Sequence, residues 1–368
     1  MNKYNNLKKN EDNDLKNEEI DLKKLLLSAH NKLILCAEKN EHFIKNVAEK
    51  LSSKKNIILT GCGDKYIISL IAKYLSDALI DKNFEVYNSR LLANYTPESI
   101  GKDSAVIFLT VGGRTIDVIE AIHQVKKKGA YMVFITQLEK KENETIYSAI
   151  KNYTNYDLII PIKKEIITHP STITSLTFLH ILNLIILYSI KDPKISIDSF
   201  LITQLIDLPD YIKQLNNNPD FHKWCIENTD KIKKIKNPFL IFIGDGPRYA
   251  ASKKAAQIQF LEHCKLVGTA IQSEEFINLI IEEFLNKDFN QIWFLLKPRP
   301  SYVGINANNR FDEMDLMIKE KFNDERKIII DPFSFIKPKG VGKKNDLILM
   351  PLYLIVIEWL TYYYNQNK

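Results

Sequence analysis

The stretch NIILTGCGDKY, residues 56–66, decides the fold, and FLIFIGDGPRY, residues 239–249, repeats it in the second half of the chain. In both stretches an apolar, β-branched run stops at a glycine, and a second glycine and a tyrosine follow. Such a run is typical of a buried strand in a parallel sheet, and the residues after the glycines are expected to begin a helix. The sequence therefore predicts that one unit occurs twice. The paired positions are Gly61 with Gly244, Gly63 with Gly246, Lys65 with Arg248 and Tyr66 with Tyr249.

Working outward from these stretches, strand-like and helix-like runs alternate in both halves. Strands are expected at residues 56–60, 105–110, 131–136, 158–162, 239–243, 292–296, 327–330 and 347–350. Helices are expected at 66–79, 116–127, 174–190 and 249–263, after two lead-in helices between 22 and 51. This alternation predicts the α/β class, with two duplicated domains that are each a parallel sheet flanked by helices on both faces.

Length and composition agree with two globular domains. The chain has 368 residues, of which 45% are hydrophobic and 26% charged, which is ordinary for a soluble protein and excludes disordered, collagen-like and coiled-coil classes. We expect a polar N-terminal tail with lead-in helices at residues 1–50, a first domain at 51–195 and a second at 196–368. The break near 192–199 follows from Asp192-Pro193.

Charge and cysteine content exclude several partners. The net charge of +6 is mild, and no block interleaves basic with aromatic residues, so a nucleic-acid partner is not expected. Four scattered cysteines and seven histidines without HxH or HxxxH spacing predict no disulfide framework, no metal and no cofactor. The N-terminus lacks the apolar core of a signal peptide, so a cytoplasmic, reducing compartment is expected.

One apolar segment, residues 347–364, invites comparison with a membrane anchor. Pro351 and Glu358 interrupt it, and its uncharged core at 347–357 is 11 residues long. A bilayer needs about 20 apolar residues in a helix. A buried strand followed by a buried helix is therefore expected, with no membrane partner.

Two loops carry residues suited to binding an anion. The turn GCGDKY, residues 61–66, offers glycine backbone N–H groups at a helix N-terminus, although it lacks the third glycine of the dinucleotide fingerprint. Taken alone, it is equally compatible with a tight strand–helix turn. The loop TVGGRT, residues 110–115, adds two hydroxyls and an arginine at the carboxyl end of the next strand. Ligands bind at that edge of open parallel sheets, which favours a phosphate site over a loop with helix-capping hydroxyls.

Together these motifs resemble those of proteins with tandem SIS (sugar isomerase) domains, similar to the isomerase part of glutamine–fructose-6-phosphate aminotransferases and to fructosamine-type deglycases. The resemblance covers about residues 22–365. The matching segments are GCGDKY at 61–66, LTVGGRTIDVIEAI at 109–122, STITSLTFLHIL at 171–182, IGDGPRYAASKKAAQIQFLEHC at 243–264 and SEEFINL at 273–279.

The resemblance implies a sugar phosphate bound at the loops of the first domain and no cofactor. It also implies a glutamate base, Glu262, which we expect to be desolvated in a cleft so that it moves a proton between C1 and C2. Arg114 stands where Glu or Asn is common, and the family's ring-opening histidine maps onto Asn278. The implied substrate-binding residues are Gly61, Gly63, Lys65, Thr110, Gly112, Arg114, Thr115, Ser171, Thr172 and Asn278.

The function expected from the resemblance is an aldose–ketose isomerase or deglycase acting on a sugar phosphate or amino-sugar phosphate. No glutaminase domain is expected, because Asn2 rather than cysteine follows Met1. The alternative is a catalytically silent sugar-phosphate-binding or regulatory subunit, since asparagine at 278 cannot shuttle a proton and the chain ends soon after TYYY. The apolar helices near 174–190 and 352–360 exceed what one sheet face needs for cover, which predicts a homodimer.

Overall fold

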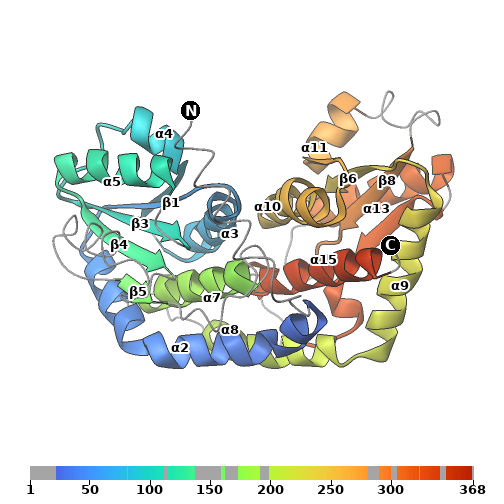
Figure 1. Ribbon diagram of the computed structural model, residues 1–368, viewed down its shortest axis with the longest axis horizontal. Helices are drawn as coiled ribbons and strands as arrows, with labels where there is room; N and C mark the ends of the chain where they lie inside the picture. Colours follow the sequence, from blue (N-terminus) through green and yellow to red (C-terminus); the bar gives the residue numbers. More distant parts are fainter. Residues whose placement is uncertain are drawn as a thin grey trace, which may run out of the picture.

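The computed structural model describes residues 22–80, 82–111, 115–136, 159–161, 173–190, 199–280, 290–299, 305–322, 324–339 and 345–366. Two sheets stand side by side above a layer of long helices (Figure 1). All strand pairings in both sheets are parallel. The α/β class expected from the alternating runs is therefore confirmed.

The two sheets share one strand order. The first has the order β2-β1-β3-β4-β5 and the second β7-β6-β8-β9, so the first four places correspond. This matches the two-unit pattern read from the sequence, whereas an origin by duplication and the boundaries at residues 50 and 195 stay predictions. The strands are β1 (Asn56–Gly61), β2 (Asn83–Asn88), β3 (Ser104–Thr110), β4 (Tyr131–Thr136), β5 (Ile159–Pro161), β6 (Phe239–Ile243), β7 (Gly268–Ile271), β8 (Gln291–Leu296) and β9 (Lys327–Ile330).

Alternate residues of a strand belong to different hydrophobic cores, because successive side chains point to opposite faces of a sheet. In β1, Ile58 joins a core beneath α4 (Ser89–Asn94) and α5 (Ile116–Lys128), whereas Ile57 and Leu59 face the opposite way. Those inward residues belong to one large core that also contains Leu240 and Phe242 of β6. A single apolar core therefore runs beneath both sheets and joins the two halves.

The helices beneath the sheets bury two apolar segments. The helices α7 (Ile173–Tyr188) and α15 (Met350–Asn365) lie roughly end to end, with α2 (Leu22–Ser52), α8 (Ser199–Asn216) and α9 (Pro219–Lys234) around them (Figure 1). Nearly every described residue of α7 and α15 is buried within one chain. Their apolar character, from which a homodimer was expected, is thus accounted for without a second copy. None of the helices in the described ranges is long and apolar enough to span a bilayer.

Three sequence expectations need correction. Residues 347–350 form no strand: they lie in α14 (Asn345–Ile348) and the start of α15, because an apolar run buried on all sides does not distinguish strand from helix. The lead-in segment is one helix, α2, in which buried Asn40 donates to the Cys36 carbonyl oxygen at 2.9 Å instead of breaking the helix. The segment 249–263 is α-helical only in α10 (Pro247–Lys254) and continues as a π-helix, η2 (Ala255–His263).

The sequence patterns did not predict two strands, β2 and β7, and both lie at the edge of a sheet. The strand β2 has one buried residue and β7 ends on one, since each pairs with a neighbour on one side only. Their apolar signal is correspondingly weak. The remaining described elements are α3 (Asp64–Leu79), α11 (Ser273–Glu275), η3 (Phe276–Ile280), α13 (Ile305–Phe322) and the short 3-10 turn η4 (Pro332–Ser334).

The two halves meet where equivalent helices face each other. The helix α3 packs against α10, and each follows the glycine turn of its own half (Figure 1). The ring of Tyr74 on α3 lies beside the second turn, 3.7 Å from where a Cβ on Gly246 would stand. In the same contact, Asp64 Oδ1 of α3 lies 2.9 Å from Lys254 Nζ of α10, and both side chains are buried. A buried ion pair thus joins the halves.

A buried histidine makes the stability of this fold depend on pH. His180 on α7 is 3% exposed, and burial lowers its pKa to about 4. The unfolded chain therefore binds a proton below pH 6.5 that the folded chain binds only near pH 4, so this contribution to stability is lost as the pH falls through that window. Between pH 7 and pH 5 the wild type should lose about 2 kcal/mol more unfolding free energy than His180→Leu. Urea denaturation at both pH values measures this, with exposed His42→Leu as the control; equal losses in wild type and His180→Leu would contradict it.

The ion pair between the halves should dominate their stability. Lys254→Met removes one of the two ammonium groups that balance the buried carboxylates of Asp64 and Glu358, and should cost about 3–5 kcal/mol of unfolding free energy. Asp64→Asn combined with Lys254→Met should cost less than the sum of the single changes, because the buried cluster then loses one charge of each sign and stays balanced. Urea unfolding of the four proteins completes the cycle. Lys73→Met breaks the partly exposed pair with Asp77 on the same helix and should cost about 1 kcal/mol or less. If the losses of unfolding free energy from the changes at Asp64 and Lys254 simply add, the two residues are not coupled and the prediction is wrong.

Candidate functional site

The two glycine turns have matching backbones. Gly63 has φ 54° and ψ −121°, and Gly246 has φ 55° and ψ −124°; both precede a helix. Positive φ favours glycine at both positions. A Cβ on Gly61 would lie 2.6 Å from the Lys65 Cβ, and one on Gly244 would lie 2.7 Å from the carbonyl carbon of Arg248. The glycines thus let each helix start directly against its strand, as the sequence pairing predicts.

Polar side chains gather at the carboxyl edge of the first sheet. Thr60 Oγ1 and Ser89 Oγ lie 3.1 Å apart at the ends of β1 and β2, and Thr136 of β4 donates to the Val111 carbonyl oxygen at 3.2 Å. Burial raises the pKa of Cys62, which also hydrogen-bonds to Ser89. Sequence reasoning missed Ser89 because the strand before it was not expected.

The second predicted loop is described only at its two ends. Thr110 is buried as the last residue of β3, and Thr115 is exposed at the start of α5 without a side-chain capping bond. Strands β1 and β3 are paired, with Gly61 opposite Leu109, so Gly61, Gly63, Lys65 and Thr110 share one sheet edge. Gly112, Arg114, Ser171 and Thr172 lie outside the described residues.

Lys65 lies in a buried charge cluster between the halves. Its Nζ is 3.2 Å from Asp64 Oδ2, and the same carboxylate is bound by Lys254 and accepts a hydrogen bond from the Ser175 hydroxyl. Burial alone would raise the pKa of Asp64, but the Lys254 and Lys65 ammonium groups and the Ser175 hydroxyl hold it below its ordinary value. Burial also lowers the pKa of Lys65, an effect that Lys254 strengthens and the carboxylate of Asp64 opposes.

A second buried carboxylate completes this cluster. Glu358 of α15 is 1% exposed, and its Oε1 lies 3.9 Å from Lys254 Nζ. Gln259 donates from Nε2 to the same oxygen at 2.7 Å. Two carboxylates and two ammonium groups, Asp64, Glu358, Lys65 and Lys254, therefore balance one another. A lone glutamate in the run LYLIVIEWL was the available sequence signal, because a charge on a buried helix needs a counter-charge.

Glu262 of the second half lies within electrostatic range of Lys65 of the first, although its effect on the pKa of Lys65 is weaker than those of burial, Asp64 and Lys254. Glu262 lies in η2, and its carboxylate acts electrostatically on Lys65 across the contact between halves. It is exposed, so the expected desolvation is not seen in one chain: its side chain lies on the outer side of η2. Asn278 is also exposed, in η3 after the carboxyl end of β7. Burial, together with the smaller effects of Lys254 and Lys265, lowers the pKa of neighbouring His263 to about 4.

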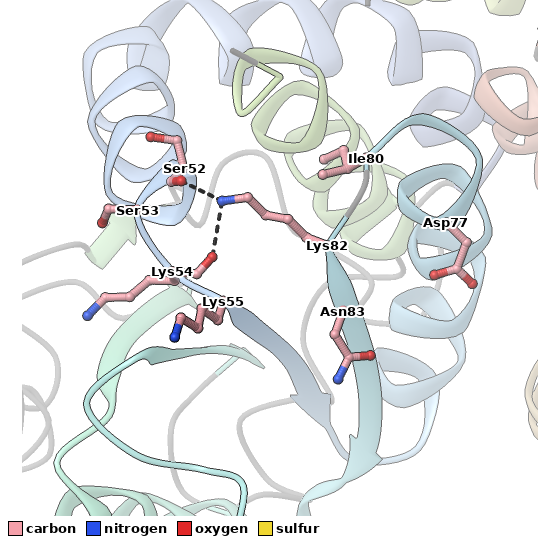
Figure 2. A pocket seen from close by; sticks show the side chains of 8 residues that line it. All are labelled: Ser52, Ser53, Lys54, Lys55, Asp77, Ile80, Lys82 and Asn83. Carbon is pink, nitrogen blue, oxygen red and sulfur yellow. Dashed lines mark hydrogen bonds between the residues drawn. The ribbon is translucent and has the colours of Figure 1, made fainter. Parts of the chain in front are cut away.

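A cavity of about 640 Å³ lies elsewhere, at the amino ends of β1 and β2 (Figure 2). There Lys82 donates from Nζ to the carbonyl oxygens of Leu51, Ser52 and Lys54 at 2.9, 2.5 and 3.0 Å. Its ammonium thereby satisfies carbonyl groups that the end of α2 leaves free. None of the site residues predicted from the sequence lines this cavity, and Lys82 has a structural role there. Within the described ranges, no group of three or more His, Cys, Asp or Glu side chains is arranged to hold a metal ion.

Comparisons with known proteins agree with this arrangement. Residues 50–188 match the family model of the SIS domain. The chain is 26% identical over 216 residues to a glutamine–fructose-6-phosphate aminotransferase (isomerizing) of Bacteroides thetaiotaomicron. That match covers 56% of this chain and 32% of the relative, so the chain spans about a third of the curated relative's length.

Solved structures show the same fold over most of the chain. The C-terminal domain of glucosamine-fructose-6-phosphate aminotransferase from Francisella tularensis has a TM-score of 0.65 at 14% identity, covering 95% of this chain and 96% of that one. Tagatose-6-phosphate ketose/aldose isomerase from Escherichia coli has a TM-score of 0.64 at 14% identity, covering 94% of each chain. Residues 50–188 therefore form a SIS domain, and the chain is related to the isomerase domain of glutamine–fructose-6-phosphate aminotransferases.

Proposed function

We propose that the chain binds a sugar phosphate or amino-sugar phosphate at the carboxyl edge of its first sheet and acts as an aldose–ketose isomerase or deglycase. The observation that carries this proposal is that Gly61, Lys65 and Thr110 share one sheet edge beside the contact between the halves, within electrostatic range of Glu262 from the second half. A cation suited to a phosphorylated ligand and a carboxylate suited to proton transfer thus border one region. The relation to isomerising aminotransferases supports the same reaction class.

The phosphate is proposed to lie between the glycine turn and the loop that begins at Thr110. The N-terminus of α3 faces this edge, and its backbone N–H groups favour negative charge. Lys65 adds positive charge near this edge, part of which the neighbouring Asp64 carboxylate neutralises. The binding residues we propose are Gly61, Gly63, Lys65, Thr110, Gly112, Arg114, Thr115, Ser171, Thr172 and Asn278, of which the structure describes Gly61, Gly63, Lys65, Thr110, Thr115 and Asn278.

Glu262 is the proposed base. In aldose–ketose exchange a base removes a proton from one of C1 and C2 and returns it to the other, while the oxygens exchange carbonyl and hydroxyl character. An exposed carboxylate at the rim of the contact between halves is free to meet the sugar end of a ligand whose phosphate lies at the sheet edge. Bound substrate would exclude water from it and so strengthen its basicity.

The second candidate is a binding or regulatory subunit without catalysis. It is favoured by the exposure of both Glu262 and Asn278, since a catalytic base is expected in a desolvated cleft. Asparagine at 278 also has no proton to exchange at neutral pH. Binding without turnover would distinguish this candidate from an enzyme.

Solvent-deuterium incorporation tests the proposal. The protein is incubated in deuterated water with fructose 6-phosphate, tagatose 6-phosphate or glucosamine 6-phosphate, and mass spectrometry follows label at C1 or C2. The wild type should exchange at least one of them, and Glu262→Gln should be about 10²–10⁴-fold slower, the usual contribution of general acid–base catalysis. Calorimetry should show unchanged binding, since glutamine keeps the shape of the side chain.

The matched control is Glu227→Gln, an exposed glutamate on α9 far along the chain from the proposed site, which should exchange like wild type. Wild-type exchange by Glu262→Gln would reject Glu262 as the base. Binding of these sugars without any exchange would establish the second candidate.

We also propose a homodimer in the cytoplasm. The dimer is supported by exposed apolar side chains around a groove of about 230 Å³ between α2, α7 and α8, namely Ile34, Tyr188 and Ile206. Light scattering at micromolar concentration should give twice the mass of one chain, and Ile206→Lys should halve it; a wild-type monomer would refute the dimer. Cys36, Cys62, Cys225 and Cys264 are not joined in disulfide bonds, which suits a reducing compartment.

A further inference from the structure

Glu358 holds the helix that carries Glu262 at two points. It is the one charged residue of α15, and its Oε1 accepts a hydrogen bond from Gln259 at 2.7 Å. Lys254 Nζ lies 3.9 Å from the same oxygen and 2.9 Å from Asp64. Lys254 ends α10 and Gln259 lies within η2, so both contacts fall on one continuous helical segment.

The spacing of these two residues requires a π-helix. In an α-helix each residue turns by about 100°, which would place Lys254 and Gln259 about 140° apart. A π-helix bonds residue i to i+5 and therefore stacks residues five apart on one side. The π-helical segment η2 starts at Ala255, directly after Lys254. The Glu358 carboxylate can contact both Lys254 and Gln259 only in this register.

The same register decides where Glu262 points. Glu262 lies three residues after Gln259 and one before the end of η2. A π-helical turn holds one residue more than an α-helical turn, so its loss would rotate the following residues by about 100°. In the observed register Glu262 lies on the exposed side of η2, within electrostatic range of Lys65 in the other half.

We propose that Glu358 is a positioning residue, which keeps η2 in its π-helical register and thereby aims Glu262 at the sugar-phosphate site. This inference rests on the proposed function only for the role of Glu262. The register itself is independent of any substrate. Glu358→Leu removes the oxygen that accepts the hydrogen bond from Gln259 and pairs with Lys254. Glu358→Gln keeps an acceptor oxygen in the same place and removes only the charge.

The first readout is the titration of His263, the last residue of η2, followed by NMR. Its pKa is lowered to about 4, chiefly by burial. If η2 relaxes in Glu358→Leu, the imidazole turns toward solvent and its pKa should rise by at least one unit toward 6.5. Removing the negative charge of Glu358 without moving η2 would not raise this pKa, so Glu358→Gln should leave it at or below about 4. The sign of the shift in the His263 pKa thus distinguishes a change in helical register from the loss of the Glu358 charge.

The second readout is the rate of deuterium exchange into fructose 6-phosphate, tagatose 6-phosphate or glucosamine 6-phosphate. Glu358→Leu should lower kcat at least tenfold with KM within about twofold, because Glu358 contacts Gln259 and Lys254, which are not among the proposed phosphate-binding residues, while the base is turned away. Glu358→Gln should stay within about threefold of wild type. Glu227→Leu, at an exposed carboxylate on α9, should leave both constants unchanged.

Two results would overturn the proposal: an unshifted His263 titration in folded Glu358→Leu, or the same upward shift in Glu358→Gln. If Glu358→Leu does not fold, Gln259→Leu removes the same hydrogen bond from the other side and should raise the His263 pKa likewise; an unshifted titration there would also overturn the proposal. If the wild type exchanges none of the three sugars, the proposed function fails, while the His263 titration still decides the register.

Discussion

The ion pair between Asp64 and Lys254 is the contact on which the arrangement of the two halves depends. It joins the first turn of α3 to the last turn of α10, and both side chains are buried beside a common apolar core. Burying charges is costly unless they are paired, so the two helices are held at the one separation that satisfies both groups. Lys65 and Glu358 extend the pair into a balanced cluster.

This cluster explains why the candidate site lies between the halves. The glycine turn brings Asp64 and Lys65 side by side at the sheet edge, so the residue that ties the halves together neighbours the residue proposed to meet the phosphate. On the other side, Lys254 leads directly into the π-helix that carries Glu262. Stability and the proposed chemistry therefore draw on the same few side chains, and a change in one affects the other.

The π-helix illustrates how a local irregularity is maintained. An i to i+5 pattern is rarer than an α-helix and persists where side chains favour it. Here Gln259 and Lys254 reach one carboxylate only in that register, and Glu358 reaches them from a helix almost a hundred residues later in the chain. Such a feature is a property of the assembled core rather than of the segment itself.

The sequence by itself determined the α/β class, the strands of both glycine stretches and the matching of Gly61 with Gly244, because short apolar runs that stop at glycine leave few alternatives. The resemblance to SIS proteins also pointed to Lys65 and Glu262, whose roles stay predictions. Only the tertiary structure decided that 347–350 is helical, that β2 and β7 complete the sheets as edges, and that Glu358 is paired. These features depend on which surfaces meet: edge strands have weak apolar patterns, fully buried runs have no period, and a buried charge reveals its partner only when distant helices pack together.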